Sequence, residues 1–153
     1  MDLNFTDLIL LIGTNPLPNF VVAEYYLKKN TNCETLWLIH SEKKRNQHGT
    51  EEYAKSLKNL LDTRHKNRNI NFNYVPLSDV SCSQKIENDI EKKLCEKISN
   101  TNIHLNYTGG TKAMCIHAYR TLEKKYGRKI SFSYLDGRNY MLVVDEDCSS
   151  TDD

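Results

Sequence analysis

The stretch Asn106-Tyr107-Thr108-Gly109-Gly110-Thr111-Lys112 combines the residue types that bind an anion through the backbone. Two adjacent glycines let the main chain approach a ligand with no Cβ in the way. Helical composition follows directly, so the N–H groups of Gly110, Thr111 and Lys112 would open a helix whose dipole favours negative charge. The hydroxyls of Thr108 and Thr111 and the Lys112 ammonium add further donors. We therefore predict an anion-binding loop; the alternative is a glycine-eased turn with Lys112 in solvent.

A second candidate loop begins at Gly13, directly after the apolar run at residues 8–12. Residues 14–19 are polar and stiffened by two prolines. In open α/β sheets, ligands bind beyond the carboxyl ends of the strands, near the point where the strand order reverses. The first and fourth strands of the chain are the usual pair there. Since both end in a glycine-containing loop, we predict that the two loops form one site.

The elements that must position these loops follow from apolar spacing. Continuous or alternating apolar runs predict strands over residues 8–12, 35–39, 70–74, 103–106, 130–134 and 140–144, with Pro76 stopping the third. Apolar residues at helical spacing predict helices over residues 19–29, 51–61, 83–98 and 113–126, with Thr50 capping the second and Gly127 ending the fourth. The pair Asp136-Gly137 is a hairpin signal between the last two strands.

Alternating strands and helices imply a Rossmann-like, doubly wound α/β fold. We expect a mostly parallel six-stranded sheet that ends in a C-terminal β-hairpin. The length of 153 residues suits one domain, over residues 1–144. The last nine residues hold five of the twenty acidic residues and no Lys or Arg, so the part before them carries a formal charge of +6. We expect residues 145–153 to be a flexible acidic tail or a linker.

Composition excludes several classes of protein. The net charge of +1 argues against bulk DNA or RNA binding. No apolar stretch is long enough to span a membrane, and no secretion signal is visible, so we expect a cytoplasmic protein. The five cysteines and five histidines show no metal-ligand spacing, and we expect no metal and no cofactor. The dinucleotide-binding and Walker glycine motifs are absent, as is a serine nucleophile elbow. The basic run Arg64, Lys66 and Arg68 is either a solvated loop or a second basic patch.

Residues 106–114, Asn-Tyr-Thr-Gly-Gly-Thr-Lys-Ala-Met, resemble the N-x-T-G-G-T-K-x-M signature of the CARF (CRISPR-associated Rossmann fold) sensor domains. The loop at residues 13–19 lies where that family has its other ligand loop. The hairpin after the last helix also resembles the family's architecture. The likeness covers residues 8–144; the long motif is its specific part, and the remainder is a general Rossmann pattern.

The resemblance implies a sensor of cyclic oligoadenylates, the second messengers made by type III CRISPR complexes, with cyclic tetra-adenylate as the first candidate. Family members are homodimers in which one symmetric ring lies across the two-fold axis. Carried over by position, Gly110, Thr111 and Lys112 would hold phosphate or ribose. Asn106 and Thr108 would shape the loop around Gly109.

Four further ligand contacts are expected from the same resemblance and from strand-end positions. Next to Gly13, Thr14 and Asn15 would meet the ribose or the adenine edge. Ser41 and His40, which end the second strand, could line the base pocket. For His40 the alternative is a satisfied polar residue at a strand end.

Two other functions stay open. The first is a metal-independent ring nuclease, in which the ribose 2′-OH attacks the adjacent phosphate and leaves a 2′,3′-cyclic phosphate. Lys112 and Thr111 would stabilise developing charge, and Ser41 or Thr14 would orient the hydroxyl; no general base is evident. The second is a nucleotide or sugar-phosphate enzyme, or a protein-interaction domain, on a similar scaffold.

Family members usually join this domain to an effector such as a nuclease, a deaminase or a DNA-binding segment. The 153 residues are already used by the Rossmann unit, so we expect the effector to be fused beyond the C-terminus or to be absent. The acidic segment with Cys148, Ser149, Ser150 and Thr151 would suit a linker.

Overall fold

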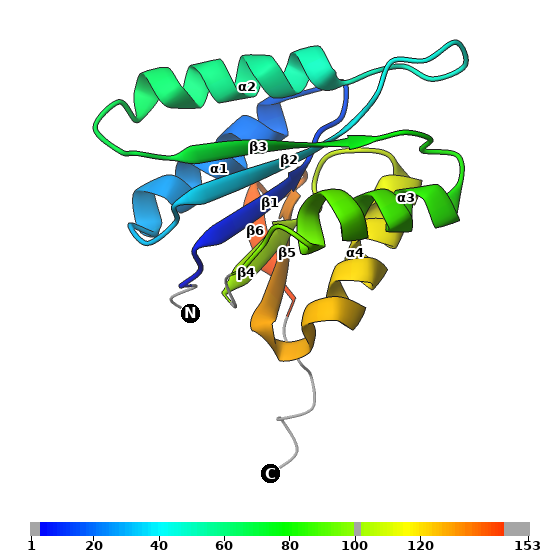
Figure 1. Cartoon of the computed structure of the whole chain (residues 1–153). Coiled ribbons are helices and arrows are strands. Elements are labelled where there is room, and N and C mark those ends of the chain that lie inside the picture. The colour runs from blue at the N-terminus through cyan, green and yellow to red at the C-terminus, as the bar shows by residue number, and fades with distance from the viewer. Residues whose placement is uncertain (1–3, 100–101, 146–153) are drawn as a thin grey trace.

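The computed structural model describes residues 4–99 and 102–145 (Figure 1). Strands alternate with helices as β1 (Asp7–Leu11), α1 (Leu17–Lys29), β2 (Thr35–Ser41), α2 (Glu51–Arg64), β3 (Asn71–Leu77), α3 (Ser83–Ile90), β4 (Ile103–Asn106), α4 (Lys112–Tyr126), β5 (Ile130–Asp136) and β6 (Met141–Val144). Of the predicted acidic tail only Asp145 is among the described residues. Cys148 and the rest of the segment at residues 146–153 lie outside them.

The six strands form one sheet in the order β3-β2-β1-β4-β5-β6. β1 to β5 are parallel, and β6 returns antiparallel to β5 as a hairpin. The predicted fold class is therefore confirmed. The chain leaves β1 toward β2 on one side and reaches β4 on the other, so the strand order reverses between β1 and β4. The two loops predicted to form one site follow these two neighbouring strands.

Two layers of helices cover the sheet, and β1 shows why (Figure 1). All five β1 residues are buried, and successive strand side chains point to opposite faces. Leu8 and Leu10 belong to a core cluster with α1 and α2, whereas Ile9 and Leu11 belong to a cluster with α3 and α4. A strand that must be apolar on both faces can only occupy the middle of such a sandwich.

The prediction that Pro76 stops the third strand is wrong. β3 runs through Pro76 to Leu77, and Pro76 lies opposite His40 of β2. β3 is an edge strand, and the Pro76 carbonyl oxygen accepts a hydrogen bond from Lys93 Nζ (2.6 Å). The N and C=O of one strand residue point to the same side, so position 76 faces away from β2 and needs no N–H there.

Two further details differ from expectation. The predicted helix over residues 83–98 divides into α3 and a π-helical turn, Glu91–Cys95, in which Glu96 N–H donates to Glu91 O (3.0 Å). Thr50 precedes α2, but its side chain does not cap that helix. Its Oγ1 instead accepts a hydrogen bond from the backbone N–H of Ser41 (3.0 Å), which ties the start of α2 to the end of β2.

The basic run before β3 is structural rather than a second basic patch. The Arg68 guanidinium donates to the carbonyl oxygens of Leu27 (2.5 Å) and Cys33 (2.6 Å), at and beyond the C-terminus of α1. Arg64 pairs with Glu24 of α1 (3.2 Å). The bond from Arg68 to Leu27 O satisfies a carbonyl that the end of α1 leaves without a helical partner.

Candidate functional site

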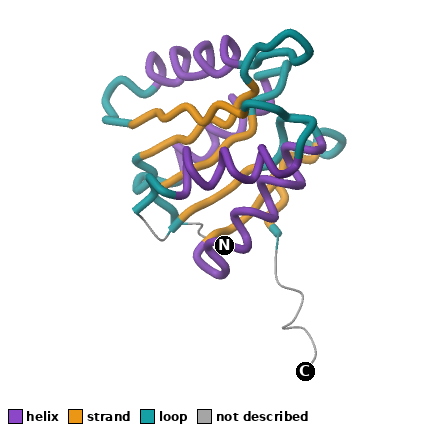
Figure 2. The backbone as a smooth tube through the Cα atoms, turned by 45° about the vertical axis from the view of Figure 1, so that its right-hand side comes forward, coloured by secondary structure: helices purple, strands orange, loops and turns teal. Residues whose placement is uncertain are grey.

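The loops after β1, β2, β3 and β4 enclose a cavity of about 710 Å³ at the carboxyl edge of the sheet. Figure 2 shows loops gathered at this edge. The side chains and backbone around the cavity come from the loop after β1 and the start of α4 on one side, and from the loops after β2 and β3 on the other: Ile12, Gly13, Thr14, Ser41, Lys44, Arg45, Asn46, Gln47, His48, Thr50, Ser78, Asp79, Val80, Ser81, Lys85, Gly110, Thr111 and Met114.

The two glycine loops meet as predicted. A Cβ on Gly13 would lie 3.0 Å from the backbone N of Gly110, so the two main chains are in close contact. Gly110 has φ +80°, a conformation that only glycine adopts without strain. A Cβ on Gly109 would clash with the carbonyl oxygen of Leu11 and would lie 2.9 Å from the Asn19 side chain. Gly109 is therefore required by a close backbone approach, and Gly110 by its positive φ.

Asn19, which the sequence did not single out, links these loops. It is fully buried, and its Nδ2 donates to Leu11 O (3.0 Å) at the end of β1. Its Oδ1 is buried against Gly109 and has no hydrogen-bond partner within the described part of the chain. Asn19 therefore fixes where α1 begins relative to the Gly-Gly turn.

Asn106 and Thr108 support the loop and do not line the cavity. Asn106 is fully buried, and its Oδ1 accepts hydrogen bonds from the N–H (3.2 Å) and Oγ1 (2.6 Å) of Thr108. Thr108 Oγ1 in turn accepts from the N–H of Leu135 in β5 (2.8 Å). Cys115 of α4 donates its thiol to the carbonyl oxygens of Tyr107 and Gly109, each at 3.3 Å. These bonds fix the loop at residues 106–109 to β5 and α4.

Thr111 and Lys112 play separate roles at the start of α4. Thr111 is the N-cap, and its Oγ1 accepts a hydrogen bond from Met114 N–H (3.2 Å); the residue also lies on the cavity lining. Lys112 is exposed and lies outside the cavity lining. A residue in that position meets only a ligand that extends out of the cavity along α4.

Among the residues predicted from the first two strand ends, Thr14 and Ser41 line the cavity, whereas Asn15 and His40 do not. Asn15 Oδ1 accepts from Leu17 N–H (3.2 Å), next to the start of α1. His40 is only 3% exposed and packs edge-on against Tyr74. Ser41 Oγ donates to His48 O (2.7 Å), which draws the loop after β2 back over the strand end.

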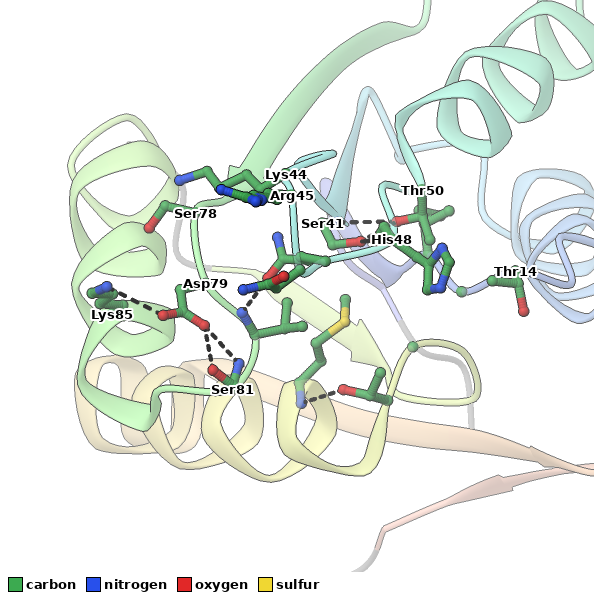
Figure 3. A pocket seen from close by; sticks show the side chains of 18 residues that line it. Thr14, Ser41, Lys44, Arg45, His48, Thr50, Ser78, Asp79, Ser81 and Lys85 are labelled. Carbon is green, nitrogen blue, oxygen red and sulfur yellow. Dashed lines mark hydrogen bonds and ion pairs between the residues drawn. The ribbon is translucent and has the colours of Figure 1, made fainter.

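The sequence reasoning missed half of the cavity, the loops after β2 and β3. Lys44 and Arg45 lie on the first loop, and Ser78, Asp79 and Ser81 lie on the second (Figure 3). A usable signal existed, because all parallel strands of one sheet end at the same edge. The cation run directly after the second strand therefore belonged to the candidate site.

The charges around the cavity are mostly positive. The one carboxylate on the lining, Asp79, accepts hydrogen bonds from Ser81 Oγ (2.5 Å) and Ser81 N–H (3.0 Å) and pairs with Lys85 (3.2 Å). The Ser81 hydrogen bonds, with the neighbouring Lys85, lower the pKa of Asp79 to about 2. Asp79 is thus ionised and neutralised by Lys85. The other basic side chains over the cavity are Arg45 and Lys44, of which Lys44 lies 3.7 Å from the Glu42 carboxylate.

Within residues 4–99 and 102–145, no three His, Cys, Asp or Glu side chains come together as a metal site. No helix in the same ranges is long and apolar enough to cross a membrane.

Two solved structures share the fold of this chain. Protein VC1899 from Vibrio cholerae superimposes with a TM-score of 0.70 at 15% sequence identity, over 96% of this chain and 34% of that one. Enterococcus italicus Csm6, in a structure bound to cyclic hexa-2'-fluoro-hexa-dAMP, gives a TM-score of 0.60 at 19% identity, over 89% of this chain and 34% of that one. This chain thus spans about a third of each of these proteins.

No curated protein matches the chain. The family model of the Card1 CARF domain matches residues 8–150, which includes both glycine loops and all of the sheet except Asp7. The resemblance carried by residues 106–114 is therefore confirmed, and the chain belongs to the Card1 CARF domain family.

Proposed function

We propose that this chain is the cyclic oligoadenylate sensor domain of a type III CRISPR ancillary effector, with cyclic tetra-adenylate as the first candidate ligand. The observation that carries the proposal is the cavity in which the Gly110–Thr111 backbone at the start of α4 faces a basic loop. Its volume of about 710 Å³ lies in the range of small-molecule sites.

The chemistry of the cavity suits a phosphate-linked ligand. Phosphate oxygens accept hydrogen bonds from unpaired backbone N–H groups at a helix N-terminus and from Lys and Arg side chains. Arg45 and Lys44 provide such donors on the side opposite α4. The backbone of Gly13 and Gly110 leaves room for close approach. The family membership and the ligand named for the Csm6 structure support the same class of ligand.

The test is a calorimetric titration with cyclic tetra-adenylate and cyclic hexa-adenylate, with linear tetra-adenylate for comparison. At least one ring should bind with a dissociation constant in the micromolar range or below. Arg45→Gln should weaken that binding roughly tenfold, because a charge-assisted hydrogen bond to phosphate is lost. Arg128→Gln, which removes the same charge from an exposed position in the turn Gly127–Lys129 after α4, should bind as the unmodified chain does. If neither ring binds at micromolar concentrations, the proposal is wrong.

The symmetric ring implies two chains, and the proposed active form is a homodimer with one ring across its axis. Each chain would contribute one Gly109-Gly110-Thr111-Lys112 loop. This places the exposed Lys112, which lies outside the cavity of its own chain, where a ring spanning two chains can reach it. The effector that such a sensor controls would be fused or separate.

Slow cleavage of the ring is a second candidate, favoured by one observation. His48 lines the same cavity as Thr14, and both are labelled in Figure 3. An imidazole there could accept the ribose 2′-OH proton while the 2′-oxygen attacks phosphorus. The bond to the 5′-oxygen breaks, that oxygen takes up a proton, and a 2′,3′-cyclic phosphate remains. Lys112 and Thr111 would stabilise the charge on phosphate, and Ser41 would orient the hydroxyl.

Incubation of the ring with the protein in EDTA, followed by chromatography, tests cleavage apart from binding. Linear product should form slowly, and His48→Ala should remove it while leaving the dissociation constant within a few fold. Lys112→Ala should also abolish it. If the intact ring is recovered after long incubation with a chain that binds it, the domain is a sensor without nuclease activity.

A further inference from the structure

The cavity walls formed by the loops after β2 and β3 are joined by one side chain, Gln47. The loop after β2 turns back on itself at Lys44 and Gln47, which exchange two backbone hydrogen bonds of 3.1 Å each. This places the Gln47 side chain between its own loop and the loop that follows β3. Both loops line the cavity.

All the hydrogen-bonding groups of the Gln47 amide are directed at backbone. Nε2 donates to Glu42 O (2.7 Å) and Leu77 O (3.3 Å), at the ends of β2 and β3. Oε1 accepts from Val80 N–H (2.8 Å), in the middle of the loop after β3. Reversing the amide would bring its oxygen against two carbonyl oxygens and its NH₂ group against an N–H, so a single orientation satisfies the surroundings.

The Gln47 side chain therefore joins the two loops through hydrogen bonds to backbone groups on both sides. The ends of β2 and β3 are already joined by a backbone hydrogen bond from Glu42 N–H to Leu77 O (3.0 Å). That bond lies at the edge of the sheet and does not hold the loops beyond it. Beyond it, the loop after β3 is held by its own turn, in which Asp79 binds Ser81, by Ser78, whose N–H and Oγ donate to Asp89 of α3 (2.7 and 2.8 Å), and by the bond from Val80 to Gln47. Of these contacts, the bond to Gln47 is the one that joins this loop to the loop after β2.

We propose that Gln47 is a positioning residue for the ligand: it fixes the spacing between the loop that carries Lys44 and Arg45 and the loop that carries Ser78 and Ser81, and thereby the affinity for the bound nucleotide. The proposal rests on the proposed function for the identity of the ligand. Its geometric part, the link from Gln47 to Val80, is independent of any ligand. Pre-organised walls bind more tightly because less loop freedom is lost on binding.

The test compares Gln47→Met with Gln84→Met. Methionine keeps the length and neutrality of glutamine but removes the amide donors and acceptor. Gln84, the other glutamine of the chain, is exposed on α3. Hydrogen exchange at the Val80 amide is followed without ligand, and the dissociation constant for cyclic tetra-adenylate and the melting temperature are measured for each variant.

In Gln47→Met the Val80 amide should exchange at least about tenfold faster, and ligand affinity should fall by roughly tenfold. Gln84→Met should change neither. If Val80 exchange is unchanged, the link does not exist and the proposal fails. If exchange rises and the melting temperature falls while affinity is unchanged, Gln47 is structural only, which overturns the proposal but leaves the proposed function intact.

Two further results are decisive. If the unmodified chain binds no ring, the proposed function fails, and the role of Gln47 in affinity fails with it, whatever Val80 exchange shows. If Gln47→Met does not fold, Gln47→Glu replaces it. Glu keeps an acceptor for Val80 N–H but presents oxygen to the carbonyls of Glu42 and Leu77, so affinity should fall relative to Gln84→Glu; equal affinities would overturn the proposal.

Discussion

His104 lies in a buried hydrogen-bond chain that reaches Asn106, which supports the Gly109–Gly110 loop, and its neighbours define its protonation. Ser133 Oγ accepts hydrogen bonds from Tyr26 OH (2.9 Å) and Asn106 Nδ2 (2.9 Å), which uses both of its acceptor sites. Its proton must then go to His104 Nε2 (2.7 Å). His104 Nδ1 therefore carries the ring proton and donates it to Ser131 Oγ (2.6 Å). The imidazole is neutral, and it supports Asn106 through Ser133.

This arrangement predicts a pH-dependent stability. Burial lowers the pKa of His104 from 6.5 to about 3, so below pH 6.5 the unfolded chain binds one more proton than the folded one. The contribution of the neutral His104 to the free energy of unfolding is fully present above pH 6.5 and is lost as the pH falls toward the folded-state pKa of about 3. Between pH 7.5 and pH 5 this group should remove about 2 kcal/mol from the free energy of unfolding measured in urea. In His104→Gln that part of the pH dependence should vanish; an unchanged slope would contradict the assignment.

Gly109 is the residue of the motif with the least room. A Cβ there meets Leu11 O and the Asn19 amide, neither of which can move without shifting β1 or α1. Gly109→Ala should lower the free energy of unfolding by about 2–4 kcal/mol and reduce ring binding by more than tenfold. Gly137→Ala is the control, since a Cβ there has nothing within 4 Å. Its unfolding should stay within about 0.5 kcal/mol of the unmodified chain. Equal stability of the two variants would show that the loop can relax.

At the scale of elements, α1 is held to the sheet by a side chain from the segment before β3. Arg68 binds the carbonyls of Leu27 and Cys33, and Arg68→Met would leave these partly buried oxygens without a donor. The free energy of unfolding should fall by about 1–3 kcal/mol. Lys66→Met removes the same charge two residues away at an exposed position and should have little effect. If both variants melt alike, net charge rather than helix capping explains the change.

The elements themselves were predictable because their signals are local. The apolar run from Leu8 to Ile12 predicts a strand buried on both faces, and the Asp136-Gly137 pair predicts the turn of the hairpin. The prediction that Pro76 ends a strand was wrong because a proline is tolerated within an edge strand. Whether β3 is an edge strand is a property of the whole sheet and not of the segment. The prediction that Thr50 caps α2 was wrong because its hydroxyl instead accepts a hydrogen bond from the backbone N–H of Ser41.

The site was predictable to the extent that it is carried by a contiguous motif. The Gly109–Gly110 turn and its partner Gly13 could be read directly, since glycine and helix N-terminus chemistry act within one loop. The contributions of Gln47 and Asn19 could not, because each binds backbone groups of segments far away in sequence. Local spacing carries no information on such contacts.

At the scale of the whole molecule, Ile116 is an exposed apolar side chain on α4, close in sequence to the Gly109–Gly110 loop. Ile116 is 54% exposed and stands one helical turn after Lys112, so both project from the same face of α4. A ring that crosses a two-fold axis requires the second chain to approach the Lys112 side of the cavity. Ile116 is therefore a residue that dimerisation would bury.

We therefore predict that dimer formation and ring binding depend on each other. Sedimentation equilibrium should give twice the chain mass of 17.8 kDa, and calorimetry should give one ring for two chains. Ile116→Lys brings two like charges together across the axis and should shift the protein to monomer, with a large loss of ring affinity. Leu60→Lys, at a 45% exposed position on α2 away from the cavity, should remain dimeric and bind normally. A dimeric Ile116→Lys would place the interface elsewhere. A monomer that binds one ring per chain would show that one cavity is sufficient and that the second chain has no part in recognition.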